Sequence, residues 1–187
     1  MLGWILLGIL VLAGIGTVAI YNRLVATRND VQGSWTQIDV QLKRRHDLIP
    51  NLVNTVKGAI EFEQDTLEKV MTARAKAVSA SGPQSKAEAE NVLTQALGRL
   101  FAVMENYPDL KSNQNSMQLQ EELTSTENRI SFARQLYNDL VANYRTALQV
   151  FPNNLVSSLF NFRPEEYFEA PAETRAVPAV NLSIRGK

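Results

Sequence analysis

Residues 2–20 read LGWILLGILVLAGIGTVAI, and no charged side chain occurs before Arg23. A helix of this length extends about 28 Å, close to the roughly 30 Å hydrocarbon core of a bilayer. The rest of the chain is polar enough to remain in water. The sequence therefore predicts a transmembrane anchor over residues 1–20 that carries a water-soluble part, and the function has to make sense at a membrane surface.

A cleavable secretory signal is the rival interpretation of this run. Such signals have a basic start, a shorter apolar core and a small-residue cleavage site, whereas no Lys or Arg precedes this run. The pattern stays compatible with a helix through Leu24, and the chain has no cysteine for a lipid anchor. We therefore expect the anchor to be retained, with Trp4 and Tyr21 at its two membrane interfaces.

Basic residues that flank the run indicate how the anchor is oriented. Only the α-amino group precedes the run, whereas Arg23 and Arg28 follow it and the basic cluster Lys43–Arg45 lies further along. Because segments rich in lysine and arginine remain in the cytoplasm, we expect the N-terminus outside and the water-soluble part inside. The absence of cysteine agrees with a reducing compartment.

The charge balance excludes some classes of partner. The chain holds 19 Lys and Arg against 19 Asp and Glu, so its net charge gives no reason to expect a nucleic-acid partner. Residues 21–60 hold six basic and three acidic side chains, and residues 61–130 hold seven basic and eleven acidic ones. The basic first helix and the acidic middle would complement each other if they packed together.

Apolar residues recur every three or four positions along most of the chain, which is typical of helices with one buried face. Turn-forming residues divide this pattern, so that the predicted helices cover residues 21–46, 50–79, 84–106 and 109–150. Short connections favour antiparallel neighbours, and we predict an all-α fold with an antiparallel up-down four-helix bundle over residues 21–162. The apolar spacing also runs through Pro50, and a kinked continuous helix is the alternative there.

The topology places several groups relative to the membrane. If anchor and first helix are continuous, that helix rises about 40 Å, so Lys43–Arg45 lie beyond the roughly 10 Å over which charges feel lipid head groups. The fourth helix returns towards the membrane with a short apolar segment, which caps the bundle or lies in the interface, and we favour capping. Its candidate membrane-interface residues are Leu155, Leu159, Phe160 and Phe162. Residues 163–187 form an extended or disordered tail, which Tyr167 and Phe168 could still dock.

A search for catalytic or metal-binding residues finds little. The chain has one histidine, His46, and no cysteine, which is too few for a usual zinc site. Lys43 stands where a di-metal Glu-x-x-His pair needs a glutamate. No nucleophile elbow, phosphate-binding loop or dinucleotide motif occurs. We expect His46 at the surface or at a helix end, and we expect no cofactor, metal or small-molecule substrate.

Polar residues on or near the buried stripes stand out instead. Buried charges need partners, so Asp39 or Asp47 would pair with an arginine from a neighbouring helix. We expect an internal network that fixes the register of the helices, and a partner-docking surface is the alternative. The candidate residues are Asp39, Arg44, Arg45, Asp47, Asn51, Glu127, Asn128, Arg134 and Asn138.

Several strings of residues resemble the LemA family. The most specific is IDVQLKRRHDLIPNLV at residues 38–53, and the others include YPDLK (107–111), LQEEL (119–123), TENRI (126–130) and YFE (167–169). The resemblance covers nearly the whole chain. It implies a bacterial inner-membrane protein with one N-terminal membrane helix and a cytoplasmic helical bundle, and it brings no enzymatic activity, cofactor or catalytic residue.

These features predict a non-enzymatic scaffold or interaction protein on the cytoplasmic face of a bacterial inner membrane. A long bundle with charged faces and a glycine-bearing anchor could assemble laterally, so we expect a homo-oligomer, with the lipid bilayer as a further partner. The alternative is a regulatory adaptor of a membrane protease or transporter, with the basic cluster and the tail as its contacts. An enzyme is the third hypothesis, which a bound metal or cofactor in the purified protein would revive.

Overall fold

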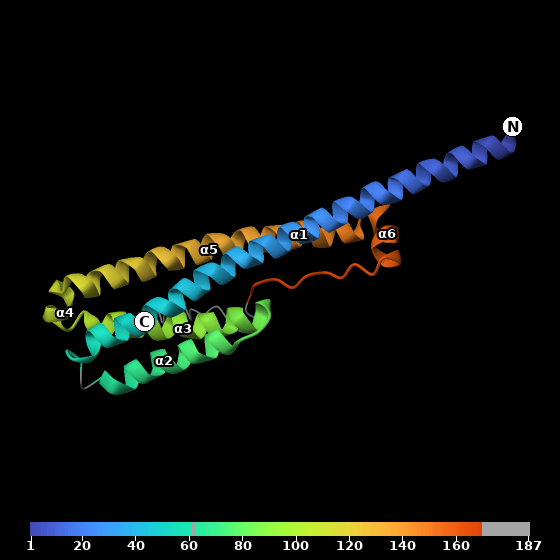
Figure 1. The fold of residues 1–187 in the computed structure, drawn as a ribbon. Coiled ribbons are helices and arrows are strands. Elements are labelled where there is room, and N and C mark those ends of the chain that lie inside the picture. Colours follow the sequence, from blue (N-terminus) through green and yellow to red (C-terminus); the bar gives the residue numbers. More distant parts are fainter. Residues whose placement is uncertain (61–62, 170–187) are drawn as a thin grey trace, which may run out of the picture.

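The computed structural model describes residues 1–60 and 63–169, which form helices joined by turns (Figure 1). No β-strand occurs in these two ranges. The predicted all-α class is therefore confirmed. The helices are α1 (Leu2–Lys57), α2 (Gln64–Ser79), α3 (Pro83–Met104), α4 (Pro108–Ser112), α5 (Gln114–Gln149) and α6 (Asn153–Leu159).

The four long helices form two pairs of unequal length. α1 packs along α5, and α2 packs against α3 in a shorter hairpin beside the part of α1 farthest from the N-terminus (Figure 1). The short helix α6 contacts both α1 and α5 at the opposite end and turns away from the direction of α1 (Figure 1). Because α1 projects well beyond its partners, a regular four-helix bundle is not confirmed.

α1 is one helix from Leu2 to Lys57. The predicted break at Pro50 is wrong, and the alternative of a helix that continues through this proline is right. Pro50 lacks the N–H that would bond the carbonyl of His46 four residues earlier, but Nε of Arg74 in α2 donates to that oxygen at 2.6 Å. A tertiary hydrogen bond replaces the missing helical one, and the helix ends only at Lys57.

The other predicted turns are confirmed, and two more were not foreseen. The helix predicted over residues 50–79 is wrong as one element, because α1 ends at Lys57 and α2 begins at Gln64. Gly82 has a φ of 82°, a left-handed conformation that glycine adopts without strain. The helix predicted over residues 109–150 is divided at Asn113. The side chain of Asn113 accepts hydrogen bonds from the backbone N–H of Asn115 at 3.0 Å and of Ser116 at 3.2 Å. Such an N-cap starts a new helix.

The core consists of two apolar clusters. The distal cluster lies at the end of α1 away from the N-terminus and includes Ile49, Leu52, Val70, Leu93, Leu100 and Leu123. The proximal cluster lies nearer the N-terminus and includes Val31, Ile38, Leu42, Ile130, Tyr144 and Phe168. Full burial of each such side chain stabilises the fold by about 1.5–3 kcal/mol. The two clusters meet where polar residues interrupt the apolar stripes.

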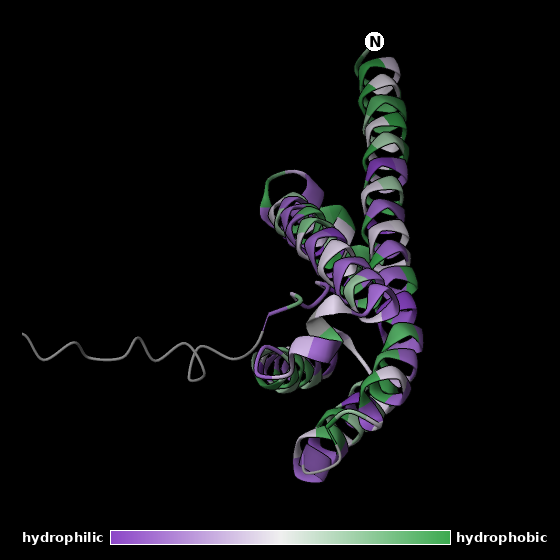
Figure 2. Ribbon diagram, turned by 90° about the vertical axis from the view of Figure 1, so that its left-hand side faces the viewer, coloured by the Kyte–Doolittle hydropathy of each residue, from purple (hydrophilic) through white to green (hydrophobic). Residues whose placement is uncertain are grey.

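The N-terminal part of α1 stands free of the other helices, and Figure 2 shows it as a largely apolar rod. Its large apolar side chains from Leu2 to Val18 are between 53% and 79% exposed. Within the described ranges, α1 is the one helix long and apolar enough to cross a membrane, and none of its most apolar stretch is buried. The part of the chain that the structure describes therefore holds one candidate membrane span, near the N-terminus.

Residues 163–169, here called the docked segment, follow α6 without helix or strand and run back along the bundle (Figure 1). Phe168 is fully buried, and its ring lies 5.7 Å from that of Trp35 in α1. The hydroxyl of Tyr137 in α5 donates to the carbonyl of Glu166 at 2.8 Å. The first part of the expected tail thus lies against the bundle, and residues 170–187 fall outside the described ranges.

Candidate functional site

Four ionisable side chains, here called the polar layer, meet between the two apolar clusters. They are Arg45 and His46 of α1, Glu90 of α3 and Glu127 of α5. Nη1 of Arg45 lies 3.0 Å from Oε2 of Glu90 and 3.0 Å from Oε2 of Glu127. Nε2 of His46 lies 2.6 Å from Oε1 of Glu90. The carboxylate of Glu90 therefore joins both basic residues.

Helical spacing explains why the polar layer forms at one level. Arg45 lies between Leu42 of the proximal cluster and Ile49 of the distal cluster, and Glu90 and Glu127 interrupt the stripes of α3 and α5 in the same way. Arg45 and Glu90 are each only 3% exposed. A slip of one helix by a turn would set a buried charge against apolar side chains, which is costly. The layer therefore fixes the register of three helices.

Further hydrogen bonds extend the polar layer. Nη2 of Arg45 donates to Oγ1 of Thr94 in α3 at 2.8 Å. Arg74 binds the carbonyl of His46 from α2, so all four long helices contact the layer. Oε2 of Glu127 is buried and forms an ion pair with Arg45. The two groups are not aligned for a hydrogen bond.

The geometry of the polar layer suits a structural network. Both oxygens of Glu90 are engaged, one by Arg45 and one by His46. His46 borders an open surface groove of about 470 Å³. Among the residues the structure describes, no group of three or more His, Cys, Asp or Glu side chains is placed to hold a metal ion. The layer links α1, α3 and α5 through ion pairs between basic and acidic side chains.

Two members of the polar layer were missed in the sequence. His46 is 9% exposed and lies inside α1, so the expected position at the surface or at a helix end is wrong. Glu90 was not among the residues predicted to form the internal network. It comes three residues after Ala87 and three before Leu93, both fully buried. A charged residue on a buried stripe was the signal that could have revealed it.

Most of the other predicted network residues lie on the surface. Asp39 pairs with Lys86 of α3 and not with an arginine. Arg44 lies 3.7 Å from Glu122 of α5, and both side chains are well exposed. The exposed residues outside the polar layer also include Asp47, Asn51 and Asn128.

Arg134 and Asn138 of α5 lie outside the polar layer and contact the docked segment. The side-chain amide of Asn138 accepts from the N–H of Phe168 at 2.9 Å and donates to its carbonyl at 3.4 Å. The guanidinium of Arg134 lies 5.0 Å from the centre of the Phe168 ring, a cation–π contact. Burial raises the pKa of Tyr137 to about 12, and two carboxylates of the docked segment add to the shift.

The candidate membrane-interface residues lie at the two ends of the apolar run. Trp4 is 79% exposed near its start. Tyr21 follows its end, and its ring lies 4.9 Å from that of Phe160 and 5.5 Å from that of Phe162. α6 buries Val156 against the bundle. Its outward apolar side chains are Leu155, which is 61% exposed, and Leu159, which is 74% exposed.

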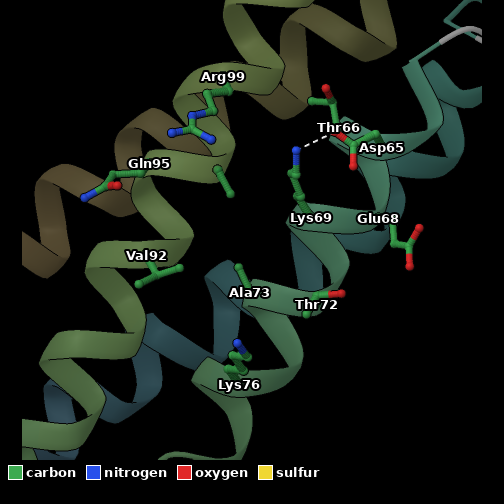
Figure 3. Close-up of a pocket in the computed structure, with 11 residues that line it drawn as sticks. Asp65, Thr66, Glu68, Lys69, Thr72, Ala73, Lys76, Val92, Gln95 and Arg99 are labelled. Carbon is green, nitrogen blue, oxygen red and sulfur yellow. Dashed lines mark hydrogen bonds and ion pairs between the residues drawn. The ribbon is translucent and has the colours of Figure 1, made fainter.

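An open groove of about 440 Å³ separates α2 from α3 (Figure 3). The basic residues that line it are Lys69, Lys76 and Arg99. Lys69 is already paired with Asp65 of the same helix (Figure 3). The mixed charges and the open shape are those of a solvated helix–helix surface.

A second groove, of about 430 Å³, lies between α1 and α5. It adjoins the groove beside His46, because Thr36 and Val40 of α1 line both. Its apolar side chains are strongly exposed: Val40 by 59%, Phe132 by 73% and Leu136 by 46%. We call these three residues the outer face.

One candidate membrane helix that continues into packed helices with a charged layer places the chain among all-α proteins with a candidate N-terminal membrane span. Within that class the chain belongs to the LemA family, whose model matches residues 34–182. The resemblance seen in the sequence is thereby confirmed.

Three relatives are similar over most of the chain. Magnetosome protein MamQ 2 of Paramagnetospirillum magneticum is 27% identical over 81% of this chain. Magnetosome protein MamQ of Magnetospirillum gryphiswaldense is 26% identical over the same share. Protein LemA of Metamycoplasma hominis is 25% identical over 80% of this chain and 68% of its own length. The match spans 66% of the length of each magnetosome protein.

Proposed function

We propose that this LemA-family protein is a membrane-anchored, non-enzymatic scaffold on the cytoplasmic face of a bacterial inner membrane, and that it binds a second copy of itself. The observation that carries the proposal is the outer face, an apolar strip that no described part of the chain covers. Phe132, its most exposed member, is 73% exposed. Contiguous exposed apolar side chains mark surfaces that a partner covers.

Anchoring favours a second copy as the partner. Two copies in one membrane stand at the same height and in the same orientation, so a two-fold axis along the bilayer normal brings each outer face against its own equivalent. Val40 lies 20 residues beyond Ile20, which is about 30 Å along α1. Confinement to one surface also raises the effective concentration of copies for each other.

The chemistry of the groove fits such an interface. An apolar centre with a polar rim is the usual composition of a protein–protein contact. Oε1 of Gln41 is buried and accepts no hydrogen bond from the described residues. An amide of a second copy, from Gln37 or Gln41, could donate to it.

The oligomeric state of the full-length chain tests the proposal. Native mass spectrometry in detergent should find dimers or larger assemblies for the wild type and monomers for Phe132→Glu. Val92→Glu is the matched control, because Val92 is 53% exposed on α3, away from the outer face. A wild-type chain that is monomeric at micromolar concentration, or a control that dissociates equally, would contradict the proposal.

The proposed compartment depends on the charges beside the anchor. Arg23 and Arg28 follow the anchor in the sequence, and the contact of Tyr21 with Phe162 sets Arg163 at the same end. Basic flanks remain in the cytoplasm. Protease added to spheroplasts should therefore leave the soluble part intact until the membrane is permeabilised, and earlier digestion would reverse the assigned orientation.

The alternative of a regulatory adaptor has less support. Its expected contact was the basic cluster Lys43–Arg45, but Arg45 is buried and Arg44 is paired with Glu122. Crosslinking in native membranes distinguishes the two functions. Self-contacts through the outer face support the scaffold, and recovery of a membrane protease or transporter in their place supports the adaptor.

A further inference from the structure

α6 presents a row of apolar side chains that the bundle leaves uncovered. Leu155 and Leu159 of α6 are four residues apart and are 61% and 74% exposed, and Phe151, in the turn before α6, is 78% exposed. We call them the apolar row. The opposite face of α6 is buried, and the hydroxyl of Ser157 on that face donates to the carbonyl of Leu148 at 3.1 Å. One face of α6 is therefore fixed to α5, and the other carries the apolar row outward.

The apolar row lies where the anchor ends. Tyr21 is the first residue after the apolar run, and the ring of Phe160, at the end of α6, packs edge-on against it at 4.9 Å. α6 turns away from the direction of α1 (Figure 1). An anchor that crosses the bilayer would therefore leave α6 beside the bilayer surface.

Basic side chains predominate in the segments at this end of the soluble part. Residues 2–29 and 140–164 contain no Asp or Glu, and their charged side chains are Arg23, Arg28, Arg145 and Arg163. Arg28 lies 3.8 Å from Glu165, and Arg145 stacks on the ring of Tyr167. Arg23 and Arg163 are exposed and belong to no ion pair within the described ranges.

We propose that the apolar row, with Arg23 and Arg163, forms a second bilayer contact that holds the base of the soluble part on an anionic membrane surface. This inference rests on the proposed anchoring by residues 2–20. A short helix with an apolar outer face and basic flanks suits the interface, because its apolar side chains enter the boundary between head groups and acyl chains. Its aromatic rings lie at head-group level, and its arginines attract anionic lipids.

A second copy of the chain fits the apolar row less well. A symmetric contact at this end would bring the same arginines together, and Glu165, the carboxylate two residues after Arg163, is already paired with Arg28. An anionic leaflet supplies hydrocarbon that can surround Leu155 and Leu159. It also supplies phosphate groups whose negative charge can pair with Arg163. The anchor also keeps this end of the molecule within reach of lipid.

Spin labels on the full-length chain in vesicles test this contact. The chain has no native cysteine, so each introduced cysteine carries one label. Leu10→Cys reports on the anchor, Leu159→Cys on the apolar row, and Asn154→Cys on an exposed polar position of α6. In vesicles of phosphatidylcholine with phosphatidylglycerol, the label at position 159 should prefer oxygen over a water-soluble nickel complex several-fold more strongly than the label at position 154. The preference should weaken in phosphatidylcholine alone.

Each other outcome overturns the proposal in a distinguishable way. If the label at position 10 is in hydrocarbon while the label at position 159 is as open to nickel as that at position 154, the second contact is absent and the anchoring stands. If the label at position 10 is also open to nickel, the anchoring itself fails, and the second contact with it. If shielding at position 159 vanishes on dilution of the protein in lipid, a second copy and not the bilayer covers the apolar row.

Discussion

Replacing Glu90 by methionine tests the polar layer most directly. The change keeps the length of the side chain but removes the carboxylate that joins Arg45 to His46. Arg45 then stays buried with Glu127 as its remaining counter-charge. Removing one partner of a buried ion pair costs about 3–5 kcal/mol, and we expect the lower end because Glu127 still compensates. For a chain of this size, about 3 kcal/mol lowers Tm by roughly 6–12 °C.

Thermal unfolding of the full-length chain in detergent, followed by far-ultraviolet circular dichroism, measures the effect. Glu88→Met is the matched control, since Glu88 is exposed on the same helix, and it should change the free energy of unfolding by less than about 0.5 kcal/mol. Arg45→Met combined with Glu90→Met removes both charges and should recover most of the loss, because apolar replacements of buried pairs are often neutral. A double variant as unstable as the sum of its two single variants would refute the reasoning.

Three further predictions concern single contacts. Arg74→Met leaves the carbonyl of His46 unpaired and should cost about 1–3 kcal/mol in chemical denaturation; the cost should fall when Pro50→Ala restores the helical N–H. Phe168→Ala should cost about 3–5 kcal/mol and make the docked segment a faster target in limited proteolysis. The folded-state pKa of Tyr137, about 12, exceeds its usual 10.0, so its stabilisation is complete below pH 10 and is lost as the pH rises to about 12. The lost part is at most about 2.7 kcal/mol, and Tyr137→Phe should remove this loss from denaturation curves measured across that range.

Local patterns in the sequence were enough for most of the fold. The apolar run, the helical stripes and the turn at Gly82 each depend on residues close together in the chain. Pro50 was misjudged because what keeps the helix intact there is Arg74, which is 24 residues away and belongs to another helix. The break at Asn113 was missed although its cap is local, because the apolar stripe continues on both sides of it.

The candidate site was less predictable than the fold. Arg45 and Glu127 were both among the candidate network residues and lie 3.0 Å apart, whereas Asp47 and Asn128, close to them in sequence, are exposed. One residue along a helix turns a side chain by about 100°, so position on the stripe decides which charges are buried. The position of Glu90 on the buried stripe of α3 could be read from the sequence, but its pairing with Arg45 could not, because that pairing joins two different helices.

The unbroken course of α1 has a mechanical consequence. With no break from Leu2 to Lys57, whatever tilts the portion inside the lipid also tilts the portion outside it. The 37 residues beyond Ile20 reach about 55 Å, so a tilt of roughly 20°, ordinary for a membrane helix, swings the far tip sideways by about 19 Å. If residues 2–20 cross a bilayer as proposed, a modest change in bilayer thickness would thus be amplified, by a lever, into a large displacement far from the membrane surface.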